Sequence, residues 1–115
     1  MEALVTDQRL DDLFTALSDR TRRDIVARLG AGDATVKELA EPYAMSVQAV
    51  SQHIRVLERS GLISQGRHRQ TRPCRLEPAA LETALSWIEQ SRRTWSDRMD
   101  RLETHLASLQ ESETQ

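Results

Sequence analysis

A short stretch of the chain carries side chains that could read a partner by hydrogen bonding. Between residues 46 and 53 lie two serines, two glutamines and a histidine: Ser46, Gln48, Ser51, Gln52 and His53. Hydroxyls, amides and an imidazole offer both donors and acceptors, as the edges of nucleic-acid bases do. A helix face that only needed to be solvated would normally carry Glu and Lys. This stretch is therefore a candidate for recognition chemistry.

Basic charge is concentrated in the same part of the chain. The 115 residues have a formal net charge of −2 and a pI near 5.9, which by itself argues against a nucleic-acid partner. Residues 45–75, however, carry +5, whereas residues 1–44 carry −3 and residues 76–115 carry −4. Within 45–75 the one acid is Glu58, and the bases are Arg55, Arg59, Arg67, Arg69, Arg72 and Arg75. Such a segment can bind phosphate although the whole chain is acidic.

Enzymatic chemistry finds no support in the sequence. There is no glycine-rich phosphate loop, no Cys/His or Ser/His pair at an informative spacing, and no pair of carboxylates in a plausible cleft. We therefore expect neither catalysis nor a bound cofactor.

Composition also bears on location. Cys74 is the only cysteine, so the chain cannot form an internal disulfide, which is consistent with a reducing compartment. No apolar run approaches the roughly 18 residues of a membrane span, and the first residues lack the pattern of a signal peptide. We expect a cytoplasmic protein without membrane contact. Cys74 itself is expected to be a strand residue and not a redox switch.

Two helices are predicted at the start of the chain. Leu10, Leu13, Phe14 and Leu17 recur at helical spacing, which indicates a helix over about 8–17 with one apolar stripe. A second helix, capped by Ser18 or Asp19, should bury Ile25, Val26 and Leu29 and end at Gly30.

Capping signals also define the third and fourth helices. Thr35 and Glu38 have the spacing of a capping box, and the short helix that they open should end near Pro42. Ser46 is the best cap for a helix over 46–60, which Gly61 should close. At 100° per residue this helix presents one apolar side and one polar side. The apolar side consists of Val47, Val50, Ile54 and Leu57, and the polar side of Gln48, Gln52, Arg55 and Arg59.

Residues 62–76 are predicted to form a basic hairpin. The two strands are expected at about 62–66 and 71–76, joined by the sequence RHRQ. Pro73 cannot donate to a ladder, so it should lie at an edge or have its backbone nitrogen facing outward, as a two-stranded ribbon permits.

The last helix should begin at Pro78 and carry a seam for another helix. Apolar residues follow a four-three alternation that is interrupted only by Arg92. A helix from 78 to about 109 would be roughly 48 Å long, too long to lie wholly on so small a domain. Together with the stripe of the first helix, this seam predicts a homodimer interface formed by Leu10, Leu13, Phe14, Leu17, Leu81, Leu85, Ile88, Trp95, Met99, Leu102, Leu106 and Leu109.

The order of these elements is that of a winged helix-turn-helix. We expect a mainly α fold with a small β-hairpin wing and a long C-terminal dimerisation helix, in one domain over 1–110, followed by a polar tail over 111–115. In such a fold the helix over 46–60 enters the major groove, and its Arg55 is expected to contact DNA. Arg67, Arg69 and Arg72 of the wing contact phosphates or the minor groove.

Two segments together carry a family resemblance. The sequences ALSDRTRRDIVARL and ELAEPYAMSVQAVSQHIRVLERSGLI resemble the ArsR/SmtB winged-helix repressors of bacteria. The resemblance implies a homodimeric repressor that binds a palindromic DNA operator and uses its first and last helices as the dimer interface. It also implies DNA contacts from Ser46, Gln48, Ala49, Ser51, Gln52 and His53 in the recognition helix, and from Arg67, His68, Arg69 and Arg72 in the wing.

The chain departs from the metal-sensing members of that family. Thr35 and Lys37 occupy the positions of their paired cysteines, and His105, near Asp100 and Glu103, lacks the second histidine of their other site. We therefore expect no metal site, and an inducer, if the protein has one, of a different and unspecified kind. Arg20 replaces the proline that many relatives carry after the Ser-Asp cap.

Two other classes of function compete with that of a DNA-binding regulator. A winged-helix module that binds protein instead of DNA would be expected to have an acidic or apolar face on the fourth helix and wing, whereas this segment carries +5. An enzyme would need a catalytic constellation, and the sequence shows none.

Overall fold

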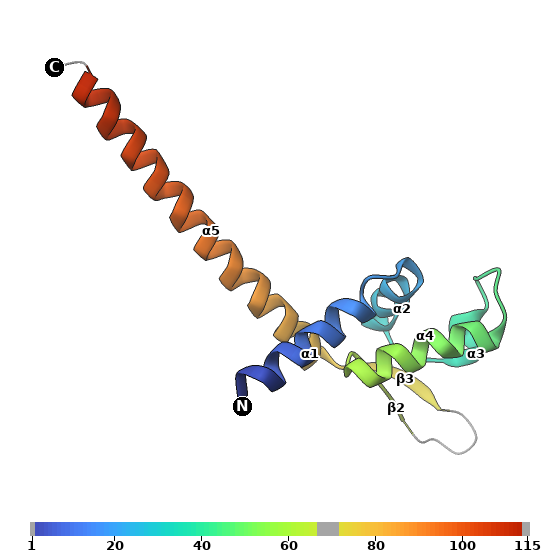
Figure 1. Cartoon of the computed structure of the whole chain (residues 1–115). Coiled ribbons are helices and arrows are strands. Elements are labelled where there is room, and N and C mark those ends of the chain that lie inside the picture. Colours follow the sequence, from blue (N-terminus) through green and yellow to red (C-terminus); the bar gives the residue numbers. More distant parts are fainter. Residues whose placement is uncertain (1, 67–71, 114–115) are drawn as a thin grey trace. The chain divides into compact units, whose positions relative to one another are not determined.

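The computed structural model describes residues 2–66 and 72–113, and the side chains of 7–66 and 72–113. Arg67, His68 and Arg69, which were predicted to contact DNA from the wing, lie outside the described residues. The chain forms two compact units, residues 1–84 and residues 85–115 (Figure 1).

The first unit begins with two helices, α1 (Glu2–Ala16) and α2 (Arg20–Ala31). Asp19 caps α2, because its carboxylate accepts a hydrogen bond of 3.0 Å from the Arg22 backbone N–H. The prediction that α2 ends at Gly30 was wrong, since the helix continues to Ala31 and is capped by Gly32 in extended geometry. Gly30 therefore has no special backbone role.

The next two helices form the helix-turn-helix, α3 (Val36–Ala40) and α4 (Val47–Ser60). Both halves of the predicted capping box are present, since Thr35 Oγ1 accepts from Glu38 N at 3.2 Å and Glu38 Oε1 accepts from Thr35 N at 3.0 Å. Gly61 closes α4 with φ of 86°, in the left-handed region. These caps fix where both helices start and where α4 stops.

The two predicted strands of the wing pair antiparallel, and a third strand that was not predicted adds to them in the described residues. Strand β1 (Ala34–Thr35), β2 (Ile63–Gln65) and β3 (Pro73–Leu76) pair antiparallel in the order β1-β3-β2. Thr35 pairs with Pro73, so Pro73 does not lie on an edge strand, which was one of its two predicted placements. Proline is tolerated in the central strand because it is the first residue of that strand.

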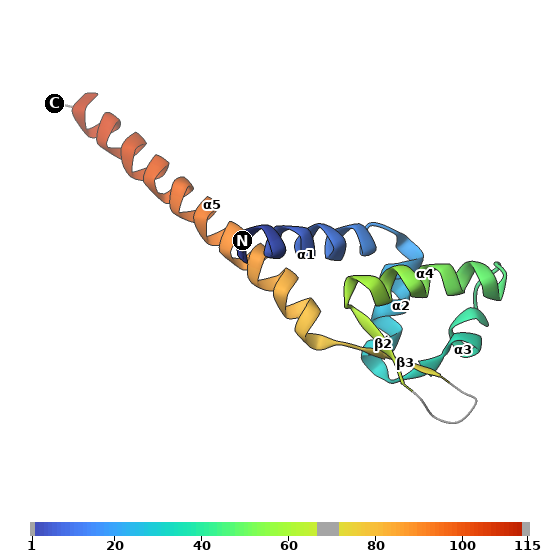
Figure 2. The same cartoon turned by 60° about the horizontal axis from the view of Figure 1, so that its bottom comes forward.

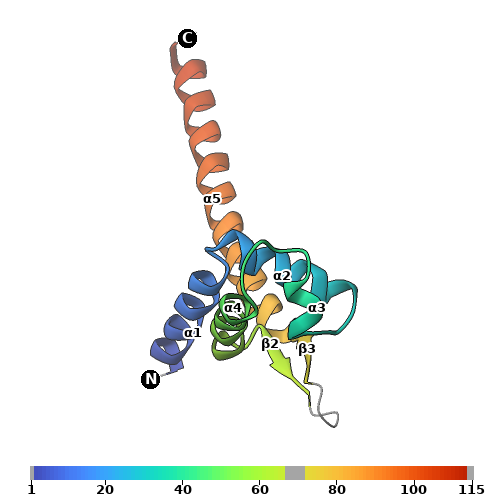
Figure 3. The same ribbon diagram turned by 90° about the vertical axis from the view of Figure 1, so that its right-hand side faces the viewer.

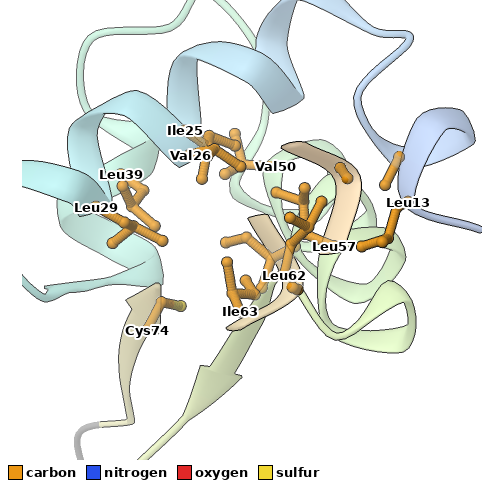
Figure 4. Close-up of a cluster of buried hydrophobic side chains, with 14 of the residues drawn as sticks. Leu13, Ile25, Val26, Leu29, Leu39, Val50, Leu57, Leu62, Ile63 and Cys74 are labelled. Carbon is orange, nitrogen blue, oxygen red and sulfur yellow. The ribbon is translucent and has the colours of Figure 1, made fainter. Parts of the chain in front are cut away.

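Helix α4 lies at the centre of the packing in this unit. Helix α1 lies along α4 (Figure 2), while α2 and α3 pack against it from other sides (Figure 3). Figure 4 shows Ile25 and Val26 of α2 directed toward Val50 of α4. Val50, Ile54 and Leu57 are buried as predicted, but Val47 is 52% exposed because it precedes the part of α4 that the other helices cover.

The apolar stripe of α1 is covered largely by its own chain. Leu13, predicted to face a second copy, is instead fully buried in the core, and Leu10 is 9% exposed. Leu17 and, from the start of the last helix, Leu81 also pack against this core. These four residues therefore contribute mainly to the stability of the single unit.

Arg22 ties three helices together. Its Nε donates to Ala16 O at 2.6 Å and its Nη2 donates to Thr15 O at 3.1 Å, which satisfies carbonyls at the end of α1. Its Nη1 lies 3.3 Å from Nδ1 of His53 in α4. A planar guanidinium can make all these contacts at once because its donors point in fixed directions.

The second unit is the remainder of the last helix, α5 (Pro78–Glu113). The helix includes residues 111–113, which were predicted to belong to a polar tail. Ala80 and Ala84, in its first turns, are buried in the first unit. From Leu85 onward the large apolar side chains are exposed, and no helix of the described residues is long and apolar enough to span a membrane.

Substituting two glycines should change stability in opposite directions. Gly61→Ala should lower the free energy of unfolding by about 1 kcal/mol, because Ala resists the left-handed conformation at φ of 86°. Gly30→Ala should raise it by about 0.5 kcal/mol, because Gly30 is helical and the nearest atom to an added Cβ is Leu76 Cδ2 at 3.9 Å. Urea unfolding checks both variants, and a stabilising Gly61→Ala would contradict the assigned cap.

Removing the Arg22 side chain should destabilise the protein clearly. Arg22→Ala should lower the free energy of unfolding by roughly 2–3 kcal/mol, because hydrogen bonds from a charged group contribute about 1.5–3 kcal/mol. The matched control is Arg20→Ala in the same helix, where the side chain is exposed and donates no hydrogen bond to any of the described residues. Thermal unfolding should separate the two, and equal midpoints would show that the Arg22 contacts contribute nothing.

Candidate nucleic-acid interface

The polar side of α4 is presented to solvent as a continuous face. Gln48, Gln52, Arg55 and Arg59 are exposed, and Ala49 and Ser51 at its borders are half-buried. Ser46 Oγ accepts a hydrogen bond of 3.1 Å from Ala49 N, so this serine serves as the cap of α4. The glutamine amides thus stand on a helix whose start and rotation are fixed by the cap and the core.

His53 is turned away from this face and is part of the contact with α2. Besides its contact with Arg22, its Nδ1 lies 3.8 Å from Asp19 Oδ2. The pKa of Asp19 lies below its usual range, chiefly because the carboxylate accepts a hydrogen bond from the Arg22 backbone N–H, with a smaller contribution from His53. The sequence left open whether His53 is structural or contacts phosphate. The structure shows the contacts of a structural histidine, with Arg22 and Asp19 of the neighbouring helix and its cap.

A polar cleft of about 460 Å³ separates α4 from the wing. Arg55 of α4 and Arg72 beside β3 line it together, so two guanidinium groups that are 17 positions apart in the chain border one space. Its remaining lining residues are Val36, Ser51, Ile54, Glu58, Gln65 and Gly66. A cleft bordered by two arginines suits a phosphate group, because guanidinium donors match its oxygens in geometry and charge.

Two residues of this cleft with long polar side chains were not foreseen as site residues. Gln65 was assigned only to a strand, and Glu58 was counted only as the single acid of the basic segment. The helical spacing of Ser51, Arg55 and Glu58 could have indicated that they share one side of α4. The part played by β2 could not have been read from spacing, because it depends on how the sheet packs.

Cys74 lies in the core and not on this surface. Its side chain is fully buried, and burial raises the pKa of the thiol to about 11, with a smaller effect from Glu58. A thiol with this pKa remains protonated at neutral pH and is a poor nucleophile and metal ligand. Within the described ranges, no three residues among His, Cys, Asp and Glu gather where they could hold a metal ion.

The chain is similar in sequence to known helix-turn-helix proteins. A family model described as a helix-turn-helix domain matches residues 17–65, which include α2, α3 and α4. The transcriptional repressor SdpR of Bacillus subtilis is 32% identical over 79 residues, which are 69% of this chain and 88% of SdpR. The HTH-type transcriptional regulator Rv2034 of Mycobacterium tuberculosis is 42% identical over 78 residues, covering 65% of this chain and 73% of that protein.

A solved structure agrees with the sequence relatives. The crystal structure of an ArsR family transcriptional regulator superposes with a TM-score of 0.72 at 35% identity, and the match covers 76% of this chain and 97% of the other. Sequence, fold and the polar face of α4 thus agree, and the chain belongs to the ArsR family of winged helix-turn-helix transcriptional regulators.

Proposed function

We propose that this chain is a homodimeric repressor that binds a palindromic DNA operator through α4 and the wing. The observation that carries the proposal is the exposed polar face of α4, where Gln48 and Gln52 stand beside the arginine-lined cleft. The relative SdpR is named a transcriptional repressor, which supports the direction of regulation. Action on DNA also agrees with the cytoplasmic location expected from the sequence.

The two parts of this surface would do different work. A glutamine amide can donate to and accept from adenine in the major groove, so Gln48 and Gln52 are suited to distinguish bases. Arg55 and Arg72 carry charge that any phosphate satisfies, so they are suited to hold the DNA backbone whatever its sequence. Ser46, Ala49 and Ser51 border the face and would permit close approach of the groove.

The second copy would be held by the exposed seam of α5. Leu85, Ile88, Trp95, Met99, Leu102, Leu106 and Leu109 are each between 38% and 63% exposed. Apolar surface repeated over several helical turns indicates an interface with another chain. With two-fold symmetry, two recognition helices would meet half-sites about one helical turn, roughly 34 Å, apart or a multiple of it.

Such a repressor would need neither a catalytic step nor a metal sensor. Thr35, at one of the positions where metal-sensing relatives carry cysteine, uses its hydroxyl to cap α3. A repressor of this kind would respond to an inducer that acts without a thiolate site.

Replacing Gln52 or Arg72 by alanine should weaken DNA binding in two different ways. Gln52→Ala should cost roughly 1–3 kcal/mol at each half-site and relax the preference at one or two base pairs. Arg72→Ala should weaken binding to all sequences alike and reduce the slope of log Kobs against log salt by about 0.9 for each phosphate that is no longer neutralised. Selection of bound sequences from random duplexes, at two salt concentrations, measures both effects. Base preferences that are unchanged in Gln52→Ala would show that α4 does not read sequence.

Placing a charge in the α5 seam should dissociate the dimer. Leu102→Glu should convert the sedimenting species to one near 13.1 kDa and abolish tight operator binding, because a carboxylate would be buried unpaired. Thr104→Glu is the control, since it adds the same charge to an exposed position about 200° further around the helix. A wild-type monomer at micromolar concentration would refute the dimer.

A further inference from the structure

A second cleft with exposed arginines lies at the start of α2. Arg20, Thr21, Arg23, Asp24 and Tyr43 line a space of about 680 Å³ between α2 and the turn that precedes α4. Arg20 and Arg23 are exposed. The sequence pattern assigned no DNA contact to either arginine, because both lie outside the basic segment over 45–75.

Contacts made by α2 hold this cleft next to the turn that precedes α4. The hydroxyl of Tyr43 donates a hydrogen bond to Asp24, which ties the turn to α2. Arg28 lies over the Tyr43 ring, with its Cζ 5.6 Å from the ring centroid, and adds a second tie. The contact between Arg22 and His53 then joins the first turn of α2 to the middle of α4.

The wing cleft and the first turn of α2, which carries Arg20 two residues before Arg22, lie on opposite flanks of the α4 face that would read DNA. Ser51, Gln52 and His53 are consecutive, so they point about 100° apart around α4. Ser51 lines the cleft beside the wing, Gln52 faces solvent, and His53 contacts α2. The Gln52 face is therefore bordered by Arg55 and Arg72 on one flank and by the first turn of α2 on the other.

The charges of the second cleft are available to an anion. Asp24, the acid among the lining residues, accepts the hydrogen bond from Tyr43 and forms no ion pair with Arg20 or Arg23 among the described residues. Arg23 uses Nη1 to donate to Leu17 O at 2.8 Å and keeps its other donors. The side chain of Arg20 forms no ion pair or hydrogen bond with any residue that the structure describes.

A helix in the major groove has one sugar-phosphate strand along each of its flanks. With the wing beside one strand, the α2 flank of α4 would be placed toward the other. We propose that Arg20, assisted by Arg23, binds a backbone phosphate of this second strand, so that each protomer grips both strands that border its half-site. This inference rests on the proposed function and adds a contact outside the recognition helix and wing.

The test compares single arginine variants on the duplex selected by the wild-type dimer. Arg20→Ala should reduce the slope of log Kobs against log salt by about 0.9 per protomer, and Arg20→Lys should retain most of it. Base preferences should not change. The control Arg9→Ala removes an equal charge beside Gly61, at the opposite end of α4, and should leave the slope as in the wild type.

Phosphate-ethylation interference locates the contact. Arg20→Ala should lose interference at phosphates on one strand of each half-site, and Arg72→Ala should lose it at phosphates on the other strand. A wild-type slope and an unaltered interference pattern in Arg20→Ala, together with the expected change in Arg72→Ala, would overturn this inference and leave the proposed function standing. If the wild-type protein selected no duplex, the proposed function itself would fail.

Discussion

Burial of the apolar stripe on α4 is the constraint on which the rest of this structure depends. Val50, Ile54 and Leu57 have at most 1% of their surface exposed, and they lie within one arc of the helix. Because three other helices and the sheet close over that arc, the rotation of α4 about its axis is fixed. A shift of α4 by one residue in register would correspond to a rotation of about 100° and would bring a polar side chain into the core. The direction in which Gln48 and Gln52 point is thus set by residues that never meet DNA.

Arginine has two separate uses in this protein, and only the structure tells them apart. Arg22 and Arg28 are engaged in internal contacts, since Arg28 donates to Leu39 O at 2.8 Å and to Glu38 O at 3.1 Å. Arg55 and Arg72 instead border an open cleft. A guanidinium that already donates to backbone carbonyls has fewer donors left for phosphate. Counting arginines therefore overstates the number of guanidinium groups that are free to donate hydrogen bonds to DNA phosphates.

Near Ala84 the apolar residues of helix α5 change from small and buried to large and exposed. Before that point it carries small buried residues, Ala80 and Ala84, which let it pack closely on the core of its own chain. Beyond it come large apolar residues such as Leu85, Ile88 and Trp95 with about half of their surface exposed. Each such side chain gains about 1.5–3 kcal/mol on full burial, so covering the row would supply a strong driving force for assembly. One helix can thus stabilise the protomer and offer a surface for a second copy.

The sequence by itself determined the local features whose causes are local. Ser46, Thr35 with Glu38, and Gly61 act through hydrogen bonds or backbone conformation within four residues, and each was correctly assigned. The periodicity of α4 likewise identified its exposed glutamines and, apart from Val47, its buried stripe. The fold class and the family also followed, because the order of the elements and their spacing are properties of the sequence.

Only the tertiary structure decided features that depend on residues far apart in the chain. Strand β1 has two residues and exists because Ala34 and Thr35 meet Cys74 and Pro73, a pairing that no local pattern announces. Leu13 has the same spacing as an interface residue, yet the core of its own chain covers it. His53 lies next to Gln52 in sequence but faces Arg22, 31 positions away. Periodicity shows which residues share a side of a helix, whereas the neighbour that each side meets is fixed by the packing of the whole chain.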